Sequence, residues 1–483
     1  MACCFNFFNA LGGKQQQQEV KKSILPVSPG KCLVFVMLQL DWLSDDGQSL
    51  RNKADMRRQL TLLKTAGVRG VMGDIWWGLC EPQPGKYHFG GVLELCDLLQ
   101  ELGLQLQAVM SFHQCGGNVG DTATYPLPAW ALDVAKEKGL LYTSRAGAVS
   151  EDCLSLSADK EVIFPSTNGG PRTALQCYQD YMAAFVGATG SHMGTTVCEL
   201  QIGMGPCGEL RYPSYQMSSG WNWPGVGLVM AHDSGMLRML KAETGMDEPP
   251  AALPEEQNAL PDDIPCFRAA EPGADASSTG FRSGPCKVFL EWYSSALMRH
   301  GRDMLTQATL ALHRARCSPS VSGLTFSVKV SGLHWHVTHP SRATEACAGY
   351  NCCTSDSADA YCSIAKLLAD SAKVAKRPVI FNFTCMEMTN NSSGGVPTAL
   401  SAPEDLIAQV RRACINHNVP LAGENALEFD LATSGWAFDQ MEKQIRSYSP
   451  GRDAMHGITL LRLGDGFVKP DSLEALGHFV SRN

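Results

Sequence analysis

The sequence contains no apolar run that approaches the roughly 20 residues needed to cross a bilayer, so no membrane partner is expected. It also lacks a basic excess, since 48 acidic residues outnumber 40 basic ones and the formal net charge is −8. Without a positive surface for the phosphate backbone, nucleic acid is not an expected partner either. The first residues show neither a secretory signal nor the Arg- and Ser-rich character of a transit peptide. We expect residues 1–30, which include a run of glutamines, to form a flexible tail.

A disulfide framework is also missing. The 19 cysteines are odd in number and follow no regular spacing, which is typical of free thiols in a reducing compartment. Four cysteines lie close together in the sequence: Cys347, Cys352, Cys353 and Cys362. Their spacing matches no common zinc-binding pattern, so no metal site is expected there. With 44% apolar and 18% charged residues, the 483-residue chain has an ordinary globular balance.

Eight short apolar runs, rich in β-branched residues, alternate with helical patterns along the chain. They cover residues 33–38, 67–75, 106–112, 197–204, 325–330, 378–384, 419–424 and 457–463. This alternation predicts a closed (β/α)₈ barrel of the TIM type rather than an open sheet. We expect one catalytic domain over residues 31–483, with insertions at about 113–196 and 205–286. Both insertions follow the C-terminal end of a predicted strand, where barrels of this kind carry their active-site loops.

The helical segments have recognisable ends. Long helices are predicted over 287–315 and 358–375, and a shorter one over 401–414 with Ser401 as its N-cap. Gly67 and Gly103 each follow a helical stripe and are predicted to end those helices.

Polar side chains stand at or just after the ends of most predicted strands. If the barrel forms, all of these side chains lie at the same end of it, because the C-terminal ends of parallel barrel strands share one face. They are Asp74, His113, Glu209, Lys329, His334, Thr384, Glu424 and Arg462.

Two of these side chains, Glu209 and Glu424, are carboxylates on different strand ends. Such a pair across a mouth is typical of glycosidic bond cleavage, in which one carboxyl gives a proton and the other stays ionised. The segments 74–78 (DIWWG) and 219–225 (SGWNWPG) offer aromatic faces on which sugar rings could pack. The alternative for each carboxylate taken alone is a buried ion pair or a loop cap, and for each Trp it is core packing.

The segment 111–121 (SFHQCGGNVGD) is rich in glycine and contains His113 and Asp121. It lacks the Lys-Ser/Thr ending of a phosphate-binding loop. Its glycines could absorb the backbone changes of a hinge, so a mobile lid is the favoured interpretation.

Taken together and in this order, seven stretches resemble the β-amylases, the inverting α-1,4-glucan hydrolases of plants and bacteria. The resemblance covers residues 31 to about 480. The stretches are GVMGDIWWG, QAVMSFHQCGGNVGD, GPCGELRYPSY, VKVSGLHWH, FNFTCMEM, AGENAL and LRL.

The resemblance implies roles for individual residues. Glu209 matches the general acid and Glu424 the general base that activates water. Asp74, His113 and Asp121 match ligands of the terminal glucose, and Thr384 matches a mobile inner loop. Further sugar contacts are implied for Lys329, His334, Asn425, Ala426 and Arg462.

The resemblance also implies the partners and surroundings of the chain. It implies starch and maltodextrins as substrates, maltose as product, and no metal or organic cofactor. The cytoplasm or a plastid would suit such an enzyme, and no sequence feature indicates an oligomeric state. The chain departs from the family pattern at three places. These are His336, the residues that follow the AGENAL stretch, and residues 38–40. These departures leave open a weakly active glucan-binding regulatory protein on the same scaffold, and a retaining glycosidase with closer carboxyls is a third alternative.

Overall fold

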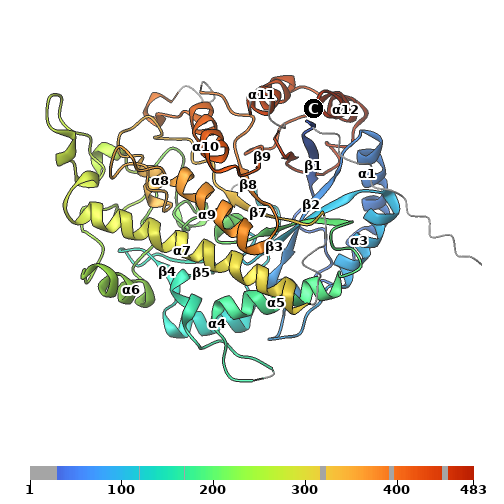
Figure 1. Ribbon diagram of the computed structural model, residues 1–483, viewed down its shortest axis with the longest axis horizontal. Helices are drawn as coiled ribbons and strands as arrows, with labels where there is room; N and C mark the ends of the chain where they lie inside the picture. The colour runs from blue at the N-terminus through green and yellow to red at the C-terminus, as the bar shows by residue number, and fades with distance from the viewer. Residues whose placement is uncertain (1–29, 119, 168, 316–322, 391–395, 449–454) are drawn as a thin grey trace, which may run out of the picture.

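Eight parallel strands close into a barrel in the computed structural model, which describes residues 30–118, 120–167, 169–315, 323–390, 396–448 and 455–483 (Figure 1). Their order around the ring is β1-β10-β9-β8-β7-β6-β3-β2. The strands are β1 (Leu33–Met37), β2 (Gly70–Trp76), β3 (Gln105–Ser111), β6 (Val197–Ile202), β7 (Thr325–Val330), β8 (Val379–Phe383), β9 (Leu421–Glu424) and β10 (Gly457–Leu460). The predicted (β/α)₈ barrel is confirmed, and each predicted run overlaps one strand. Residues 1–29 of the predicted tail lie outside the described residues.

Burial on both faces explains why the strands are continuous apolar runs. Every residue of β3 and of β8 is buried. Parallel strands have helices on one face and the barrel interior on the other, so neither face meets water. The chain closes on itself at β1, which pairs with both β2 and β10.

Helices form the layer outside the barrel. They are α1 (Lys53–Thr65), α2 (Trp77–Cys80), α3 (Gly90–Leu102), α4 (Ala129–Lys138), α5 (Ala174–Ala188), α6 (Ser234–Thr244), α7 (Gly284–Arg314), α8 (Ala343–Cys347), α9 (Ala360–Ala375), α10 (Pro403–His417), α11 (Gly435–Arg446) and α12 (Pro470–Arg482). The 31-residue α7 contacts both α5 and α9 (Figure 1).

Three helix ends were predicted from the sequence, and the structure agrees with two of them. Gly103 ends α3 with a φ of 68°, and Gly67 follows the last turn of α1 with a φ of 87°, a backbone conformation that glycine adopts readily. The predicted N-cap at Ser401 is wrong. Helix α10 begins at Pro403 with Ala402 as its N-cap, because proline is pre-organised for the first helical position. The Ser401 hydroxyl instead hydrogen-bonds the His334 ring, 2.8 Å from its Nδ1.

The two long connections build structure above the C-terminal ends of β3 and β6. The first contains α4, an antiparallel hairpin of β4 (Leu141–Thr143) and β5 (Val149–Leu154), and then α5. The hairpin was not predicted, since its strands are short and the centre of β5 is the polar stretch 150–152. The second connection contains α6 and several single turns of 3₁₀ helix before α7.

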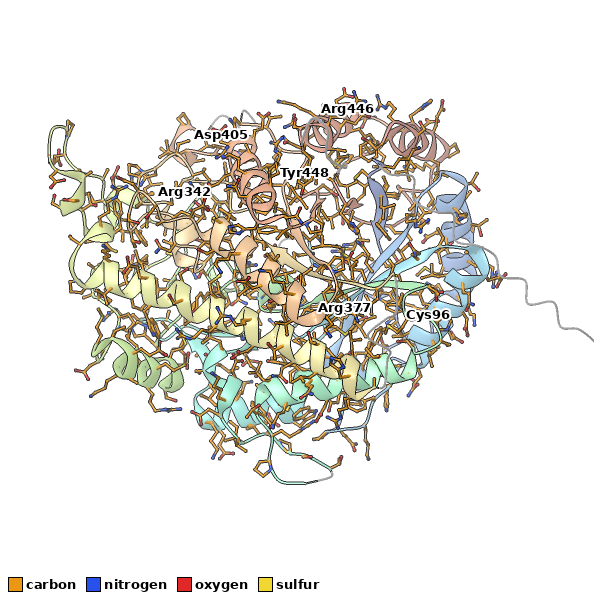
Figure 2. The ribbon with its side chains drawn as sticks, in the orientation of Figure 1. Cys96, Arg342, Arg377, Asp405, Arg446 and Tyr448 are labelled. Carbon is orange, nitrogen blue, oxygen red and sulfur yellow. The ribbon has the colours of Figure 1, made fainter. Side chains whose placement is uncertain are left out.

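Every cysteine that the structure describes is free of disulfide bonding, and most are buried. Cys96 of α3 is fully buried (Figure 2). Burial raises the pKa of the Cys96 thiol to about 12, so this thiol stays protonated and unreactive at neutral pH. Within the described ranges, no helix has the length and apolar character to cross a membrane.

Candidate active site

A cavity of about 610 Å³ opens at the C-terminal ends of the barrel strands. All eleven side chains singled out in the sequence line it. They are Asp74, His113, Asp121, Glu209, Lys329, His334, Thr384, Glu424, Asn425, Ala426 and Arg462. The barrel therefore brings together residues that are up to 388 positions apart in the chain (462 − 74), as its geometry requires.

Glu209 follows β6 on a tight turn that depends on glycine. A Cβ on Gly205 would lie 2.7 Å from the Glu209 carbonyl oxygen, and Gly208 has a φ of 75°. The turn brings Glu209 beside β7, where the Leu210 N–H donates to the Lys329 carbonyl at 2.9 Å. Arg211 Nε donates to Glu209 Oε2 at 2.6 Å, and this pair is buried. The backbone and the guanidinium together fix the direction in which the carboxyl points.

Glu424 ends β9 and is 2% exposed. Lys329 Nζ lies 2.8 Å from its Oε2, and Asn382 Nδ2 donates to its Oε1 at 2.6 Å. Both oxygens are thus held by groups that stabilise negative charge. Burial alone would lower the pKa of Lys329, but the charge and hydrogen bond of Glu424 outweigh it and the pKa of Lys329 is raised. Lys329 therefore presents a charged ammonium group to Glu424, whose carboxyl group lines the cavity.

Lys329 connects the two carboxyl groups. Its side chain binds Glu424, while its backbone carbonyl binds the segment that carries Glu209. Because both connections come from one residue of β7, the acidic side chains are held on the same cavity in a fixed relation.

One side of the cavity carries the three residues predicted to bind a chain end. Asp74 Oδ1 accepts a hydrogen bond from the Ser111 hydroxyl at 2.8 Å. Asp121 Oδ2 accepts from the backbone N–H groups of Gly116 and Asn118, both at 2.9 Å, and so shapes the glycine-rich loop. Burial, helped by the positive charges of Lys329 and Arg211, lowers the pKa of His113 to about 3.

The neutral His113 ring has polar capacity to offer a ligand. Among the described residues, its Nδ1 has no hydrogen-bond partner. The ring packs edge-on against Trp76, with centroids 5.4 Å apart, so its orientation is fixed. Nδ1 is itself buried, so a sugar hydroxyl would have to meet the other ring nitrogen of this neutral imidazole.

The other predicted contacts are partly engaged with the protein. Thr384 Oγ1 accepts from the Gly332 N–H at 2.6 Å, and Asn425 Nδ2 donates to the Leu427 carbonyl at 2.7 Å. The Ala426 N–H donates to the Glu387 carboxylate at 2.9 Å. Arg462 NH1 donates to the Leu38 carbonyl at 3.1 Å. These bonds fix the positions of four wall residues.

The aromatic segments divide between wall and core. Trp76, Trp221 and Trp223 line the cavity, together with Tyr215 and Trp335. Trp77 does not. It is fully buried in the outer core, where its Nε1 donates to Glu81 at 2.7 Å. Strand alternation explains the split, since neighbouring side chains at a strand end point to opposite faces.

His336, the departure that cast doubt on sugar binding, is absent from the described cavity lining. Its ring is buried, with Nδ1 3.0 Å from the Thr344 hydroxyl. Burial lowers its pKa to about 4, so the ring is neutral. The substitution therefore changes packing behind the wall.

Sequence reasoning missed three residues that hold the site: Arg211, Asn382 and Glu387. Arg211 lies in the GPCGELRYPSY stretch, two positions after Glu209, and its pairing could have been suspected from that spacing alone. Asn382 lies inside β8 next to Lys329 in the ladder, and Glu387 lies in the loop after β8. Their roles depend on contacts with distant segments, for which the sequence gives no signal.

A layer of buried polar side chains lies beneath the cavity, inside the barrel. Gln107 Nε2 donates to Glu199 Oε2 at 3.1 Å, and the Thr459 hydroxyl donates to Gln107 Oε1 at 3.1 Å from across the barrel. Burial, with a smaller contribution from the charge of Glu424, raises the pKa of Glu199 to about 7. Glu199 is therefore a proton-binding group in the polar layer beneath the cavity.

Glu199→Gln should change how stability depends on pH. The folded protein keeps the Glu199 proton up to about pH 7, whereas the unfolded chain releases it near pH 4.3. The free energy of unfolding should therefore fall as the pH rises through this interval, because the folded state binds the extra proton. Glutamine imitates the protonated acid, so the variant should lose less stability between about pH 4.5 and 7.

Thermal melting across that interval measures the effect. Glu474→Gln, on an exposed side chain, is the control and should follow the wild-type curve. Parallel curves for Glu199→Gln and the wild type would contradict the interpretation.

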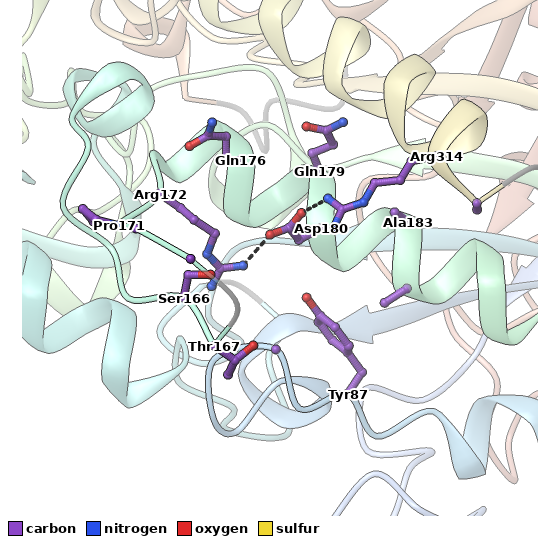
Figure 3. Close-up of a pocket in the computed structure, with 15 residues that line it drawn as sticks. Tyr87, Ser166, Thr167, Pro171, Arg172, Gln176, Gln179, Asp180, Ala183 and Arg314 are labelled. Atoms are coloured by element: carbon purple, nitrogen blue, oxygen red, sulfur yellow. Dashed lines mark hydrogen bonds and ion pairs between the residues drawn. The ribbon is translucent and has the colours of Figure 1, made fainter.

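A second cavity, of about 600 Å³, lies on the outside of the barrel and offers different chemistry. Asp180 lies between two guanidinium groups and pairs with both, with Arg172 NH1 at 2.7 Å and with Arg314 (Figure 3). Arg172, Asp180 and Arg314 are the only charged residues in the described lining of this cavity, and the aspartate pairs with both arginines. This cavity joins α5, the end of α7 and the loop before α5, and it holds no pair of carboxyls.

Comparisons with known proteins agree on one family. The model of glycosyl hydrolase family 14 matches residues 35–482. The chain is 39% identical over 458 residues to chloroplastic β-amylase 2 of Oryza sativa subsp. japonica, covering 93% of this chain and 76% of that relative. It is 40% identical over 440 residues to chloroplastic β-amylase 1 of Arabidopsis thaliana, covering 88% and 71%. The crystal structure of a β-amylase catalytic domain from Paenibacillus polymyxa superposes with a TM-score of 0.71 at 25% identity, covering 94% of this chain and 99% of that one.

Proposed function

Because the chain belongs to glycosyl hydrolase family 14, the β-amylase family, we propose that Glu209 is its general acid and Glu424 its general base. Family membership makes the chain a glycoside hydrolase that cleaves α-1,4-glucosidic bonds with inversion. Nothing observed favours the inactive glucan-binding alternative. The residue roles rest on one observation: two buried carboxyl groups, one paired with Lys329 and the other with Arg211, line a single cavity.

The contacts of Glu424 suit a base. A group that takes a proton from water must be ionised beforehand, and Lys329 with Asn382 stabilises that state on both oxygens. The same contacts hold the carboxylate in place, so that a water molecule between it and the anomeric carbon is oriented for attack.

Glu209 is assigned the acid role by its place in the GPCGELRYPSY stretch, since its ion pair with Arg211 alone would favour the ionised form. Oε2 is held by Arg211, and within the described part of the chain no hydrogen-bond donor contacts Oε1. Oε1 is therefore the oxygen that carries the proton to the leaving glycosidic oxygen. When the bond breaks, water adds its hydroxyl to the anomeric carbon, its proton goes to Glu424, and the Glu209 proton completes the new 4-hydroxyl of the shortened chain.

Three other residues of the cavity lining would bind the non-reducing end of the glucan. Asp74, Asp121 and His113 offer two carboxylates and a neutral imidazole to its hydroxyls. A site that encloses a chain end releases short products one after another, which fits maltose as product and starch or maltodextrins as substrate.

A plastid is the compartment that we propose for this activity. Both plant relatives described above carry the word chloroplastic in their names. Free buried cysteines are compatible with a reducing stroma. Imaging of a fluorescent fusion of the full chain in plant cells would test this location.

Product stereochemistry tests the proposed reaction. The wild-type chain should release maltose from soluble starch, and polarimetry of the fresh product should detect the β-anomer before mutarotation. Inversion follows from attack by water on the face opposite the leaving oxygen. Release of the α-anomer first would indicate a retaining mechanism, and absence of maltose would contradict the activity itself.

A further inference from the structure

The rim of the active cavity differs from its floor. The floor carries the charged residues, whereas the rim carries large apolar side chains that are open to solvent. Met217 is 49% exposed, Trp223 37% and Leu427 53%. Exposed indoles and thioethers gathered at the edge of a binding cavity mark a contact surface, since water solvates them poorly.

The loop that carries Trp223 is held firmly in place. The Asn222 N–H donates to Asn258 Oδ1 at 2.7 Å, directly before the tryptophan. After it, the Gly225 carbonyl accepts from the indole N–H groups of Trp221, at 2.8 Å, and of Trp335, at 3.2 Å. Glycine is required at 225, because a Cβ would lie 2.3 Å from the Asn258 Cα. The indole is therefore presented from a fixed backbone, and binding a ligand there costs little ordering of the loop.

Met217 lies on the same loop and belongs to the same surface. It sits between Gln216, whose side chain binds Asp152 at 3.0 Å, and Ser218, whose N–H donates to the Gly117 carbonyl at 3.3 Å. Its flexible thioether can follow the shape of a neighbouring ring. Trp223 and Met217 thus provide a rigid and an adaptable apolar contact from one connection that lines the cavity.

We propose that Trp223 and Met217 form an outer glucan subsite, which binds glucose units beyond those held next to Glu209 and Glu424. The inference rests on the proposed function, because a glucan held by its non-reducing end must leave the cavity across the rim. A glucose ring has an apolar C–H face that packs on an indole, and its hydroxyls can remain in water at a half-open surface. The occupant is therefore the emerging part of the substrate chain, and the subsite favours long maltodextrins over short ones.

Chain-length dependence of the kinetics tests the subsite. The ratio of kcat/KM for maltoheptaose to kcat/KM for maltotetraose should fall about tenfold in Trp223→Ala, equivalent to about 1.4 kcal/mol of lost binding to the longer chain. Trp223→Phe keeps an aromatic face and should recover most of the ratio. Met217→Ala should lower it by a smaller factor.

Trp436 in α11 supplies a matched control. It is 56% exposed but does not line the cavity, so Trp436→Ala should leave the ratio at its wild-type value. Isothermal titration of the Glu209→Gln protein, with and without Trp223→Ala, measures binding apart from turnover, and the second substitution should weaken maltoheptaose binding about tenfold.

The outcomes separate the subsite from the reaction. An active wild-type enzyme whose ratio is unchanged in Trp223→Ala, with unchanged maltoheptaose binding, would overturn the subsite and leave the proposed function intact. A wild-type chain that releases no maltose would instead contradict the proposed function.

Discussion

Glu424→Gln is expected to lower kcat on soluble starch by about 10³-fold, within the usual contribution of a general base. Glutamine keeps the size of the side chain and can still accept the Asn382 hydrogen bond, but it cannot take a proton from water. Glu209→Gln should cause a loss of similar size, because the leaving oxygen then departs without a proton. Reducing-sugar release under saturating starch measures both.

A substrate with a better leaving group distinguishes the two roles. Fluoride departs without protonation, so Glu209→Gln should regain most of its activity on α-maltosyl fluoride, whereas Glu424→Gln should not. Circular dichroism provides the folding control. If Glu424→Gln were the variant rescued by fluoride, the roles would be reversed, and near-normal turnover of starch by either variant would contradict the assignment of that residue.

Lys329→Met is expected to lower the free energy of unfolding by about 3 kcal/mol, the low end of what breaking a buried ion pair costs. Methionine fills much of the same space but leaves Glu424 as a buried charge without its cation. The substitution should also reduce kcat strongly, since the base loses the contact that orients it. Urea denaturation at neutral pH and steady-state kinetics measure the two effects.

The pair between Lys366 and Asp370 on the surface of α9 is the control for this experiment. Both side chains are more than half exposed, so solvent and salt weaken their attraction. Lys366→Met should therefore unfold close to the wild-type urea concentration and keep its activity. A Lys329→Met protein that unfolds there too would show that the buried pair adds nothing to stability.

The barrel could be predicted because its signal repeats along the chain. Each strand is a short run buried on both faces, and eight such runs alternating with helices favour one architecture. The β4–β5 hairpin carries no such signal, because Val149 is exposed and Thr143 and Glu151 are only partly buried. The start of α10 was misplaced for a local reason, since Ser401 is a good cap by type but its hydroxyl is used by His334.

The cavity lining could be predicted from strand ends and from the family resemblance, but its internal contacts could not. Glu209 and Glu424 stand out as carboxylates after strands. Asn382, the partner of Glu424, becomes visible only when β8 is placed beside β9, whereas Arg211 lies two residues from Glu209 and could have been suspected. The Glu199 layer was missed for a related reason, because a barrel interior is expected to hold branched apolar residues.

The double connection of Lys329 bears on how such an enzyme can diverge in sequence. Lys329 contacts the turn that carries Glu209 through its carbonyl oxygen and contacts Glu424 through its ammonium group. Substitutions in the outer helices and distant strands can therefore accumulate while the acid and base keep their spacing. Conversely, a protein engineer who wants a different spacing would change the glycine-dependent turn at 205–208, because a substitution at 329 leaves the backbone carbonyl in place.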